Sequence, residues 1–280
     1  MEAISDARKT AIFARSVSSC LRSLAIASAL AIVAPASMAE EEMEFDEAHV
    51  FFELNDTDGD LGIHALIDGE PWKRLEIADP NERRMLLISV NGRLRRQGLT
   101  EVFFESAEPP FDELSPQMFF RRFPAGEYEI EGRTLDGEEL ESIAELTHVM
   151  PAPPQPTVNG NGLAEECDPE EPGYDAPLVV GPVTIAWPPV TMSHPDPEGG
   201  GAGVQPPVLV TVHNYEVVVE ADVEVNGEEL TAVTSTVLPP DQTSYTIPAE
   251  FLSLSDQFKY EILVREDSFN QTAIENCFQM

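Results

Sequence analysis

The fold of this chain is constrained most by a series of short apolar runs, each closed by a turn. Ile63–Ile67 ends at the pair Asp68-Gly69, and Met85–Val90 ends at the pair Asn91-Gly92. Runs of this length between such turns are typical of β-strands, whereas an amphipathic helix needs a longer run with a 3.6-residue period. The sequence therefore predicts an all-β protein. The expected strands are His49–Leu54, Ile63–Ile67, Trp72–Ile77, Met85–Val90, Thr100–Glu105, Tyr128–Thr134, Leu140–Val149, Val183–Trp187, Val208–Val212, Tyr215–Glu220, Asp222–Asn226, Glu229–Leu238, Ser244–Ile247, Phe258–Arg265 and Thr272–Phe278.

One short helix is expected among the first strands, within residues 111–123. Ser115 is a favourable N-cap residue, and Pro116 follows it at the first helical position. Pro124 ends the segment, because the residue before a proline is disfavoured in the helical conformation.

The first residues of the chain have the pattern of an export signal. Four basic residues precede the apolar run Leu24–Val33, which is long enough for a signal peptide and too short to span a bilayer. Small residues in Ser37-Met38-Ala39 then predict cleavage after Ala39, so residues 1–39 form the signal. The mature protein is expected outside the cell, at the cell surface or in the periplasm. No second long apolar run follows, so membrane insertion is not expected.

The mature chain is expected to divide into two domains at a stretch rich in proline and glycine. Prolines in Met150–Pro156 favour an extended and stiff chain, and glycines in Asn159–Gly162 loosen it. The prediction is a β-rich first domain over residues 47–149, a proline, glycine and acidic linker over 150–175, and a second domain over 176–280. Each domain has the strand and turn pattern of a β-sandwich.

Three segments of the second domain share a recognisable arrangement. Leu252 lies six residues before Phe258, which opens the alternating strand Phe258–Val264, like the corner between strands E and F of a sandwich. Val183–Trp187 looks like strand B with its core tryptophan, and Tyr215–Glu220 looks like strand C. With these residues, the region resembles a fibronectin type III domain. The resemblance implies an immunoglobulin-like fold for residues 176–280.

Two positions depart from that family. Phe258 stands where tyrosine is usual, and a phenylalanine cannot make the hydroxyl-to-backbone bond that pins the corner. Leu254 stands where the family often has proline. The corner is therefore expected to be less rigid. The whole chain is also similar to bacterial secreted proteins that place an acidic β domain before such a module, and that resemblance implies no activity.

The chain is strongly acidic, with 51 Asp and Glu against 16 Lys and Arg and a formal charge of −35. The expected signal carries a net charge of plus two, so its removal takes the mature protein to −37. Such a charge repels nucleic acid and anionic membranes, and neither is expected as a partner. Divalent cations, basic partners and simple solubility in salty surroundings are all compatible with it.

Two cysteines, Cys167 and Cys277, follow the expected signal. In an exported protein an even pair indicates a disulfide, and this one would join the acidic stretch before the second domain to the last strand of that domain. Two free thiols are the alternative.

An aspartate-rich loop follows the first expected strand and is the best candidate for a metal site. Asp56, Asp58 and Asp60 match the first three ligand positions of an EF-hand loop. Leu61 and Ile67 break the match, because they stand where that loop needs a glycine and a glutamate. The loop is predicted to be either a β-loop calcium site or an ordinary Asp-Gly surface turn.

A basic region contrasts with the acidic background. It is a candidate for binding an anionic polymer such as an acidic polysaccharide, or an acidic face of another copy. The alternative is pairing with carboxylates of the same domain. Its members are Lys73, Arg74, Arg83, Arg84, Arg93, Arg95 and Arg96.

Catalysis has little support in the sequence, and no catalytic residue is assigned. No GxSxG nucleophile motif or phosphate-binding GxxxxGK[ST] loop occurs. His49 and His64 fall inside expected strands, where a structural histidine is the commoner case. The main hypothesis is a non-catalytic secreted binding or structural protein of the bacterial surface or matrix, with a protein or polysaccharide partner.

Two other functions remain open. One is a secreted carbohydrate-active enzyme or its accessory domain, which would need two facing carboxylates in a cleft. The other is a subunit of a self-assembling extracellular fibre, in which the basic region of one copy meets the acidic second domain of the next.

Overall fold

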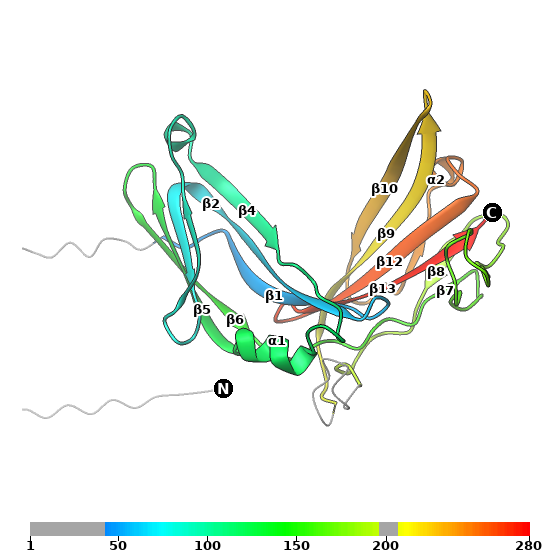
Figure 1. The fold of residues 1–280 in the computed structure, drawn as a ribbon, viewed down its shortest axis with the longest axis horizontal. Helices are drawn as coiled ribbons and strands as arrows, with labels where there is room; N and C mark the ends of the chain where they lie inside the picture. The colour runs from blue at the N-terminus through cyan, green and yellow to red at the C-terminus, as the bar shows by residue number, and fades with distance from the viewer. Residues whose placement is uncertain (1–42, 196–206) are drawn as a thin grey trace, which may run out of the picture. The chain divides into compact units, whose positions relative to one another are not determined.

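The computed structural model describes residues 43–195 and 207–280, which belong to one compact unit, Glu40–Met280. The expected export signal lies outside the described residues. The all-β prediction is confirmed, because strands dominate and the described residues hold only two short α-helices and one 3-10 helix (Figure 1). The strands are β1 (Glu47–Asn55), β2 (Asp60–Ala78), β3 (Arg84–Ser89), β4 (Leu99–Glu105), β5 (Gly126–Thr134), β6 (Glu139–Leu146), β7 (Thr157–Val158), β8 (Thr184–Ala186), β9 (Val212–Val225), β10 (Glu228–Leu238), β11 (Ser244–Thr246), β12 (Gln257–Glu266) and β13 (Gln271–Gln279); the helices are η1 (Leu94–Arg96), α1 (Pro116–Arg122) and α2 (Ala249–Leu252).

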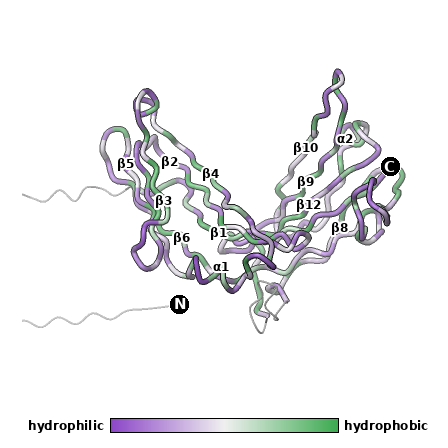
Figure 2. The backbone as a smooth tube through the Cα atoms, viewed as in Figure 1, coloured by the Kyte–Doolittle hydropathy of each residue, from purple (hydrophilic) through white to green (hydrophobic). Residues whose placement is uncertain are grey.

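Ten of the strands form one sheet in the order β10-β9-β12-β13-β1-β2-β5-β6, with β3 and β4 also paired to β2. Apolar and polar residues alternate along strands such as β9 and β12, as the changes of colour along the tube show (Figure 2). Because successive side chains of a strand point to opposite faces, this alternation gives the sheet one buried and one solvent-facing side.

The long strand β2 serves two parts of the sheet. Its first half pairs with β1 and β4, and its second half pairs with β3 and β5. The register shifts between Asp68 and Trp72, so the strand bends where the sequence predicts a reversal at Asp68-Gly69. Gly69 lacks a side chain because Phe45 packs there: a Cβ would lie 3.2 Å from the Phe45 ring. The expected second and third strands are therefore one bent strand.

The bend folds the sheet over a first hydrophobic core, which α1 helps to cover. Phe52, Trp72 and Tyr128 are fully buried in it. Each large apolar side chain buried in this way contributes about 1.5–3 kcal/mol relative to an exposed one. The helix begins at Pro116, as the sequence predicts, but the side chain of Ser115 makes no capping hydrogen bond.

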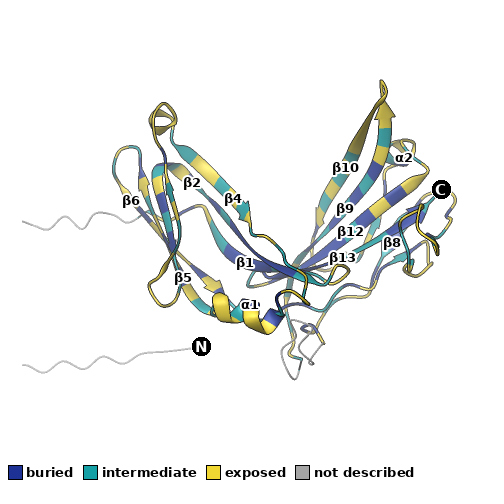
Figure 3. Ribbon diagram, in the orientation of Figure 1, coloured by how far each residue is buried: buried dark blue, intermediate teal, exposed yellow. Residues whose placement is uncertain are grey.

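A second core lies between β10-β9-β12-β13 and a small sheet of order β11-β8-β7. Trp187 packs edge-on against Tyr215 with ring centroids 5.3 Å apart, and Phe258 stacks on Phe278 at 4.9 Å. The strand β7 comes from the stretch 150–175, where Val158 is buried in this core. Buried residues concentrate along β1 and β12, whereas the tip between β9 and β10 is exposed (Figure 3).

The strands β1 and β13 join the two halves of the large sheet. They run parallel, and their register pairs Glu53 with Gln271 and Asn55 with Ala273. Asn270 supports the junction from the turn before β13: its side chain accepts a hydrogen bond from Phe52 N at 2.8 Å and donates one to Val149 O at 2.9 Å. The strands β12, β13, β1 and β2 are therefore neighbours in one sheet, and side chains at paired positions of these strands lie on the same face of it.

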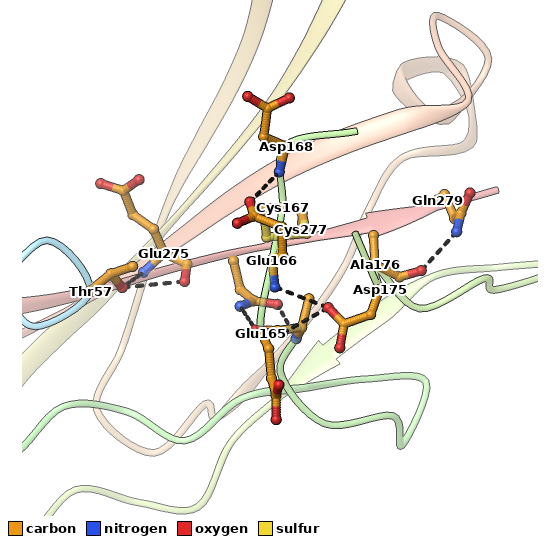
Figure 4. The surroundings of a disulfide bond; sticks show 12 residues. Thr57, Glu165, Glu166, Cys167, Asp168, Asp175, Ala176, Glu275, Cys277 and Gln279 are labelled. Atoms are coloured by element: carbon orange, nitrogen blue, oxygen red, sulfur yellow. Dashed lines mark hydrogen bonds between the residues drawn. A yellow bond between two sulfur atoms is a disulfide. The ribbon is translucent and has the colours of Figure 1, made fainter. Parts of the chain in front are cut away.

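The cysteines Cys167 and Cys277 form the disulfide expected from the sequence, with Cα atoms 5.7 Å apart. Ala164 and Asn276 reinforce it through two hydrogen bonds of 2.8 and 3.0 Å. Asp175 accepts the backbone N–H groups of two glutamates just before the bond (Figure 4). The acidic loop around Cys167 is thus fixed to β13.

Candidate functional site

The side of the large sheet that carries polar residues across β9, β12, β13, β1 and β2 is called here the open face. Buried residues of these strands, such as Val217 and Ile262, point into the cores, and the alternate positions form the open face. Seven of its charged or titratable members are Glu216, Glu220, Glu261, Arg265, Glu275, Glu53 and His64.

Carboxylates crowd the middle of the open face. Glu261 on β12 lies directly opposite Glu275 on β13 in the antiparallel register. Burial, together with the charges of Glu53, Glu275 and Glu216, raises the pKa of Glu261 to about 8. At neutral pH this carboxyl is therefore largely protonated, and a cation placed nearby would favour its ionised form.

A chain of polar contacts crosses the open face from β12 to the segment after β4. Arg265 Nε donates to Gln271 Oε1 at 2.8 Å, and Gln271 Nε2 donates to Glu53 Oε2. Glu53 Oε2 lies 3.7 Å from His64 Nδ1, and Nε2 of His64 lies 3.0 Å from Glu108 Oε1. The two parts of the large sheet are thus linked through side chains as well as through the backbone.

Among the side chains of this series of polar contacts, His64 is the most buried, with 3% of its surface exposed. Phe51 and Phe103 flank it, with ring centroids 5.4 and 5.8 Å from the imidazole centroid. These rings exclude water from the sides of the imidazole, so its two nitrogens face carboxylates in a low-dielectric setting.

Glu108 reaches His64 because the segment after β4 is fixed along β2. Ser106 N donates to Ile63 O, and Ile63 N donates to Ser106 Oγ, both at 3.0 Å. Gly62 leaves the space that Glu108 occupies: a Cβ at this position would lie 2.1 Å from Glu108 Oε1. The absence of a side chain at Gly62 therefore lets the Glu108 carboxylate approach the backbone of β2 closely.

Asp60 lies at the edge of the same cluster. Its Oδ1 is buried, and no group among the described residues donates a hydrogen bond to it. Burial, together with the charges of Glu108 and Asp58, raises its pKa to about 6. An unsatisfied buried carboxylate oxygen is costly, and a cation would remove that cost.

The open face contains a hollow of about 560 Å³. Glu53, His64, Glu216 and Glu261 are among its polar lining residues, and Phe103 is among its apolar ones. Exposed aromatic and acidic side chains lie together here, which suits a contact surface for a basic and partly apolar partner.

The aspartates expected to bind calcium are not gathered into one ligand set. Asp56 Oδ1 is hydrogen-bonded to His194 Nε2 at 2.8 Å, whereas Asp58 is exposed and Asp60 feels the charge of Glu108. Asn55 Oδ1 accepts the backbone N–H groups of Thr57 and Asp58, which makes the loop an Asx turn. Calcium binding by Asp56, Asp58 and Asp60 stays a prediction.

The structure splits the basic region into paired and exposed members. Arg74 and Arg84 both contact Glu76, and Arg83 lies 3.8 Å from Asp79. Lys73 Nζ donates to a backbone carbonyl at 3.2 Å. The remaining members, Arg93, Arg95 and Arg96, lie on the exposed η1 segment and make no ion pair with any described residue.

The cluster of Glu53, His64 and Glu108, whose side chains could together bind a metal ion, is not among the sites predicted from the sequence. Within the described part of the chain, it is the one group of three or more His, Cys, Asp or Glu residues whose possible ligand atoms all lie within 4.8 Å of one another. The hairpin of β1 and β2 pairs Glu53 with Gly62, so Glu53 and His64 share a face, and that much follows from the strand and turn pattern. Glu108 lies in the loop after β4, and no strand or turn pattern in the sequence places it next to His64.

No protein family matches the chain by sequence, and no curated protein matches it. Two solved structures show a distant likeness. One concerns host cell surface retention of a 1.5-MDa bacterial ice-binding adhesin, with 9% identity, a TM-score of 0.20, and coverage of 85% of this chain and 65% of that chain. The other is a tetra-tandem repeat in the extending region of a large adhesion protein, with 10% identity, a TM-score of 0.20, and coverage of 83% and 50%. This chain thus spans about two thirds of the length of the first structure and half of the length of the second.

In the described part of the chain, no helix is long and apolar enough to cross a membrane.

Proposed function

We propose that this chain is an exported, non-catalytic binding or structural protein of the bacterial cell surface or extracellular matrix. Its open face would be the surface that holds a basic partner. Export is supported by the apolar run Leu24–Val33 and the small residues that follow it. The observation that carries the binding role is the crowding of Glu216, Glu261, Glu275 and Glu53 on four adjacent strands.

The physical reason is electrostatic. Each of these carboxylates raises the cost of ionising its neighbours, and this cost is relieved when lysine or arginine side chains of a partner approach. A sheet presents the carboxylates on a rigid frame, so little side-chain ordering is needed on binding. A partner rich in lysine and aromatic residues would match both the acidic and the aromatic parts of the face.

A lysine-rich peptide tests this role. Binding to the purified protein, measured by fluorescence anisotropy, should weaken as salt rises. The double variant Glu216→Gln/Glu220→Gln should lose about tenfold in affinity, since each lost charge contact is worth roughly 0.5–1 kcal/mol. A matched variant, Glu127→Gln/Glu129→Gln, removes two charges from β5 and should bind almost normally. Equal losses in both variants would mean that net charge alone attracts the peptide, and the role of the open face would be rejected.

Self-association is a second candidate, favoured by the exposed segment of Arg93, Arg95 and Arg96. These arginines form no ion pair with described residues, although the chain has a large excess of carboxylates. A second copy would supply an acidic open face to receive them. Sedimentation velocity should then show salt-sensitive assembly that Arg95→Gln/Arg96→Gln weakens, and a monomer at all concentrations would exclude it.

We also propose that residues 157–280 are a fibronectin type III-like module. The proposal is supported by the strand orders β11-β8-β7 and β10-β9-β12-β13, which correspond to the two sheets of such a sandwich, and by Trp187 in the core next to β8. An experimental structure of the protein would test it through the order and direction of these strands.

A further inference from the structure

We propose that Glu53, His64 and Glu108 form a binding site for a divalent transition-metal ion, with Zn²⁺ the best match. The inference goes beyond the proposed function and does not depend on it, because an ion can bind here whether or not the open face holds a partner. Three independent features of the cluster support it: the donor set, the space kept by Gly62 and the unsatisfied oxygen of Asp60.

The donor set combines one imidazole and two carboxylates. Imidazole suits Zn²⁺ and other late first-row ions, whereas Ca²⁺ and Mg²⁺ prefer oxygen ligands alone. The ligand atoms lie within 4.8 Å of one another, and the nearest pair, His64 Nε2 and Glu108 Oε1, is 3.0 Å apart. Tetrahedral Zn²⁺ with bonds of about 2.0–2.1 Å separates its ligand atoms by about 3.3 Å. Glu108 already faces Nε2 of His64, whereas Glu53 faces Nδ1 and must rotate toward Nε2 when an ion binds there.

The surroundings hold these groups in position. Gln271 donates to Glu53, and Phe51 and Phe103 flank His64, which is 3% exposed. A ligand carboxylate with its own hydrogen-bond partner is usual around bound metals. The two paired strands and the segment after β4 contribute one ligand each, so a bound ion would cross-link three segments.

Gly62 and Asp60 both lie beside the place where an ion would sit. A Cβ on Gly62 would overlap Glu108 Oε1 at 2.1 Å, so the backbone keeps this space for the carboxylate. Asp60 Oδ1 is buried without a hydrogen-bond donor among the described residues, and Asp60 interacts electrostatically with both Glu108 and Glu53. A cation bound beside this oxygen would take the place of the missing hydrogen-bond donor.

The test uses Zn²⁺ alone with the untagged, purified protein, measured by isothermal titration calorimetry. One Zn²⁺ should bind per chain, and Glu108→Gln and His64→Gln should each weaken binding at least tenfold. Glu101→Gln removes the same charge as Glu108→Gln from an exposed position on β4 and should bind Zn²⁺ normally. If His64→Gln does not fold, Gly62→Ala gives an equivalent test: the new methyl group displaces only the flexible Glu108 side chain, so the fold should persist while zinc affinity falls.

Two results would overturn the site. One is an unmodified protein that takes up no Zn²⁺, which would leave His64 as a histidine held between two carboxylates. The other is Zn²⁺ binding that Glu108→Gln, His64→Gln and Gly62→Ala all retain at the affinity of the Glu101→Gln control. The lysine-rich peptide is titrated separately without metal. An unmodified protein that binds the peptide but takes up no Zn²⁺ therefore rejects the metal site and leaves the proposed function standing.

Discussion

Glu261 and Glu275 face each other on the neighbouring strands β12 and β13, at directly paired positions of the antiparallel register. Like charges in such pairs destabilise a sheet. Here the conflict is relieved by a proton, because the pKa of Glu261 is raised to about 8 by burial and by the charges of Glu53, Glu275, Glu216 and Glu220. The free energy of unfolding therefore depends on pH through the carboxylates of the open face.

The stability of the protein should fall as pH rises from 5 to 8. Glu261 has a folded pKa of about 8, above its ordinary value of 4.5, so its protonated form favours the fold below pH 4.5. That stabilisation is lost progressively as pH rises toward 8. Asp60, with a folded pKa of about 6, adds a loss of the same sign between about pH 4 and pH 6. Urea unfolding at pH 5, 6.5 and 8 should show a total decrease on the order of 2 kcal/mol, since partial solvation moderates the shift.

The variant Glu261→Gln isolates this effect. A neutral amide cannot ionise, so the variant should be more stable than the unmodified protein at pH 8 and should show a flatter pH profile. Glu129→Gln, on the exposed side of β5, should keep the original profile. An unchanged pH profile in Glu261→Gln would show that the titrating group lies elsewhere.

Reduction of the disulfide should destabilise the protein substantially. The bond closes a loop with a sequence separation of 110, and the chain-entropy model gives about 5 kcal/mol for a loop of this length. The double variant Cys167→Ser/Cys277→Ser should unfold at clearly lower urea than the oxidised protein. Its stability should not respond to a reducing agent, and a decrease below about 1 kcal/mol would mean that the loop is held mainly by Ala164 and Asn276.

Charge reversal at Glu131 should stabilise the first part of the sheet. Glu131 on β5 lies opposite Glu76 on one side and Glu141 on the other. Glu131→Lys replaces two like-charge pairs by two opposite-charge pairs, worth about 0.5–1 kcal/mol in total at low salt. Thermal melts in low and high salt should show a gain that shrinks with salt. A gain that persists in high salt would point to packing instead.

Calcium should not act through Asp58 if the loop keeps the conformation seen here. Asp56 is engaged by His194 and Asp58 is exposed, so the three aspartates present no shared site. A thermal melt with excess calcium and then with chelator should give the same result for Asp58→Ala as for the unmodified protein. A calcium-dependent rise of several degrees that Asp58→Ala abolishes would restore the aspartate loop as a calcium site.

Much of the fold can be predicted from the sequence, because alternation and turns are local signals. The strand β1, the turn after Asn55 and the start of β2 all follow from residues within about twenty positions. The bend of β2 does not, because Asp68-Gly69 has the composition of a reversal while Gly69 serves a contact with Phe45. The strand β9 likewise runs through Ala221, which is buried and preserves the alternation, although two strands are expected there.

The candidate sites are harder to predict, because their members are distant in sequence. Asp56 meets His194 across 138 positions, and His64 meets Glu108 across 44. Only the tertiary arrangement brings these side chains together. In the basic region, Arg74, Arg83 and Arg84 pair within the domain, as one of the two explanations expects. Arg93, Arg95 and Arg96 make no ion pair with a described residue, and their binding of an anionic partner stays a prediction.

The Cys167–Cys277 bond also decides how far the chain can be drawn out by a pulling force. Tension that enters at the N-terminal side reaches Cys167, crosses to Cys277 through the sulfur atoms and leaves at the C-terminus. The stretch between the two cysteines bears no load while the bond is intact. At about 3.4 Å per extended residue, roughly 370 Å of chain is withheld from extension. The oxidised protein is therefore much less extensible than the reduced protein.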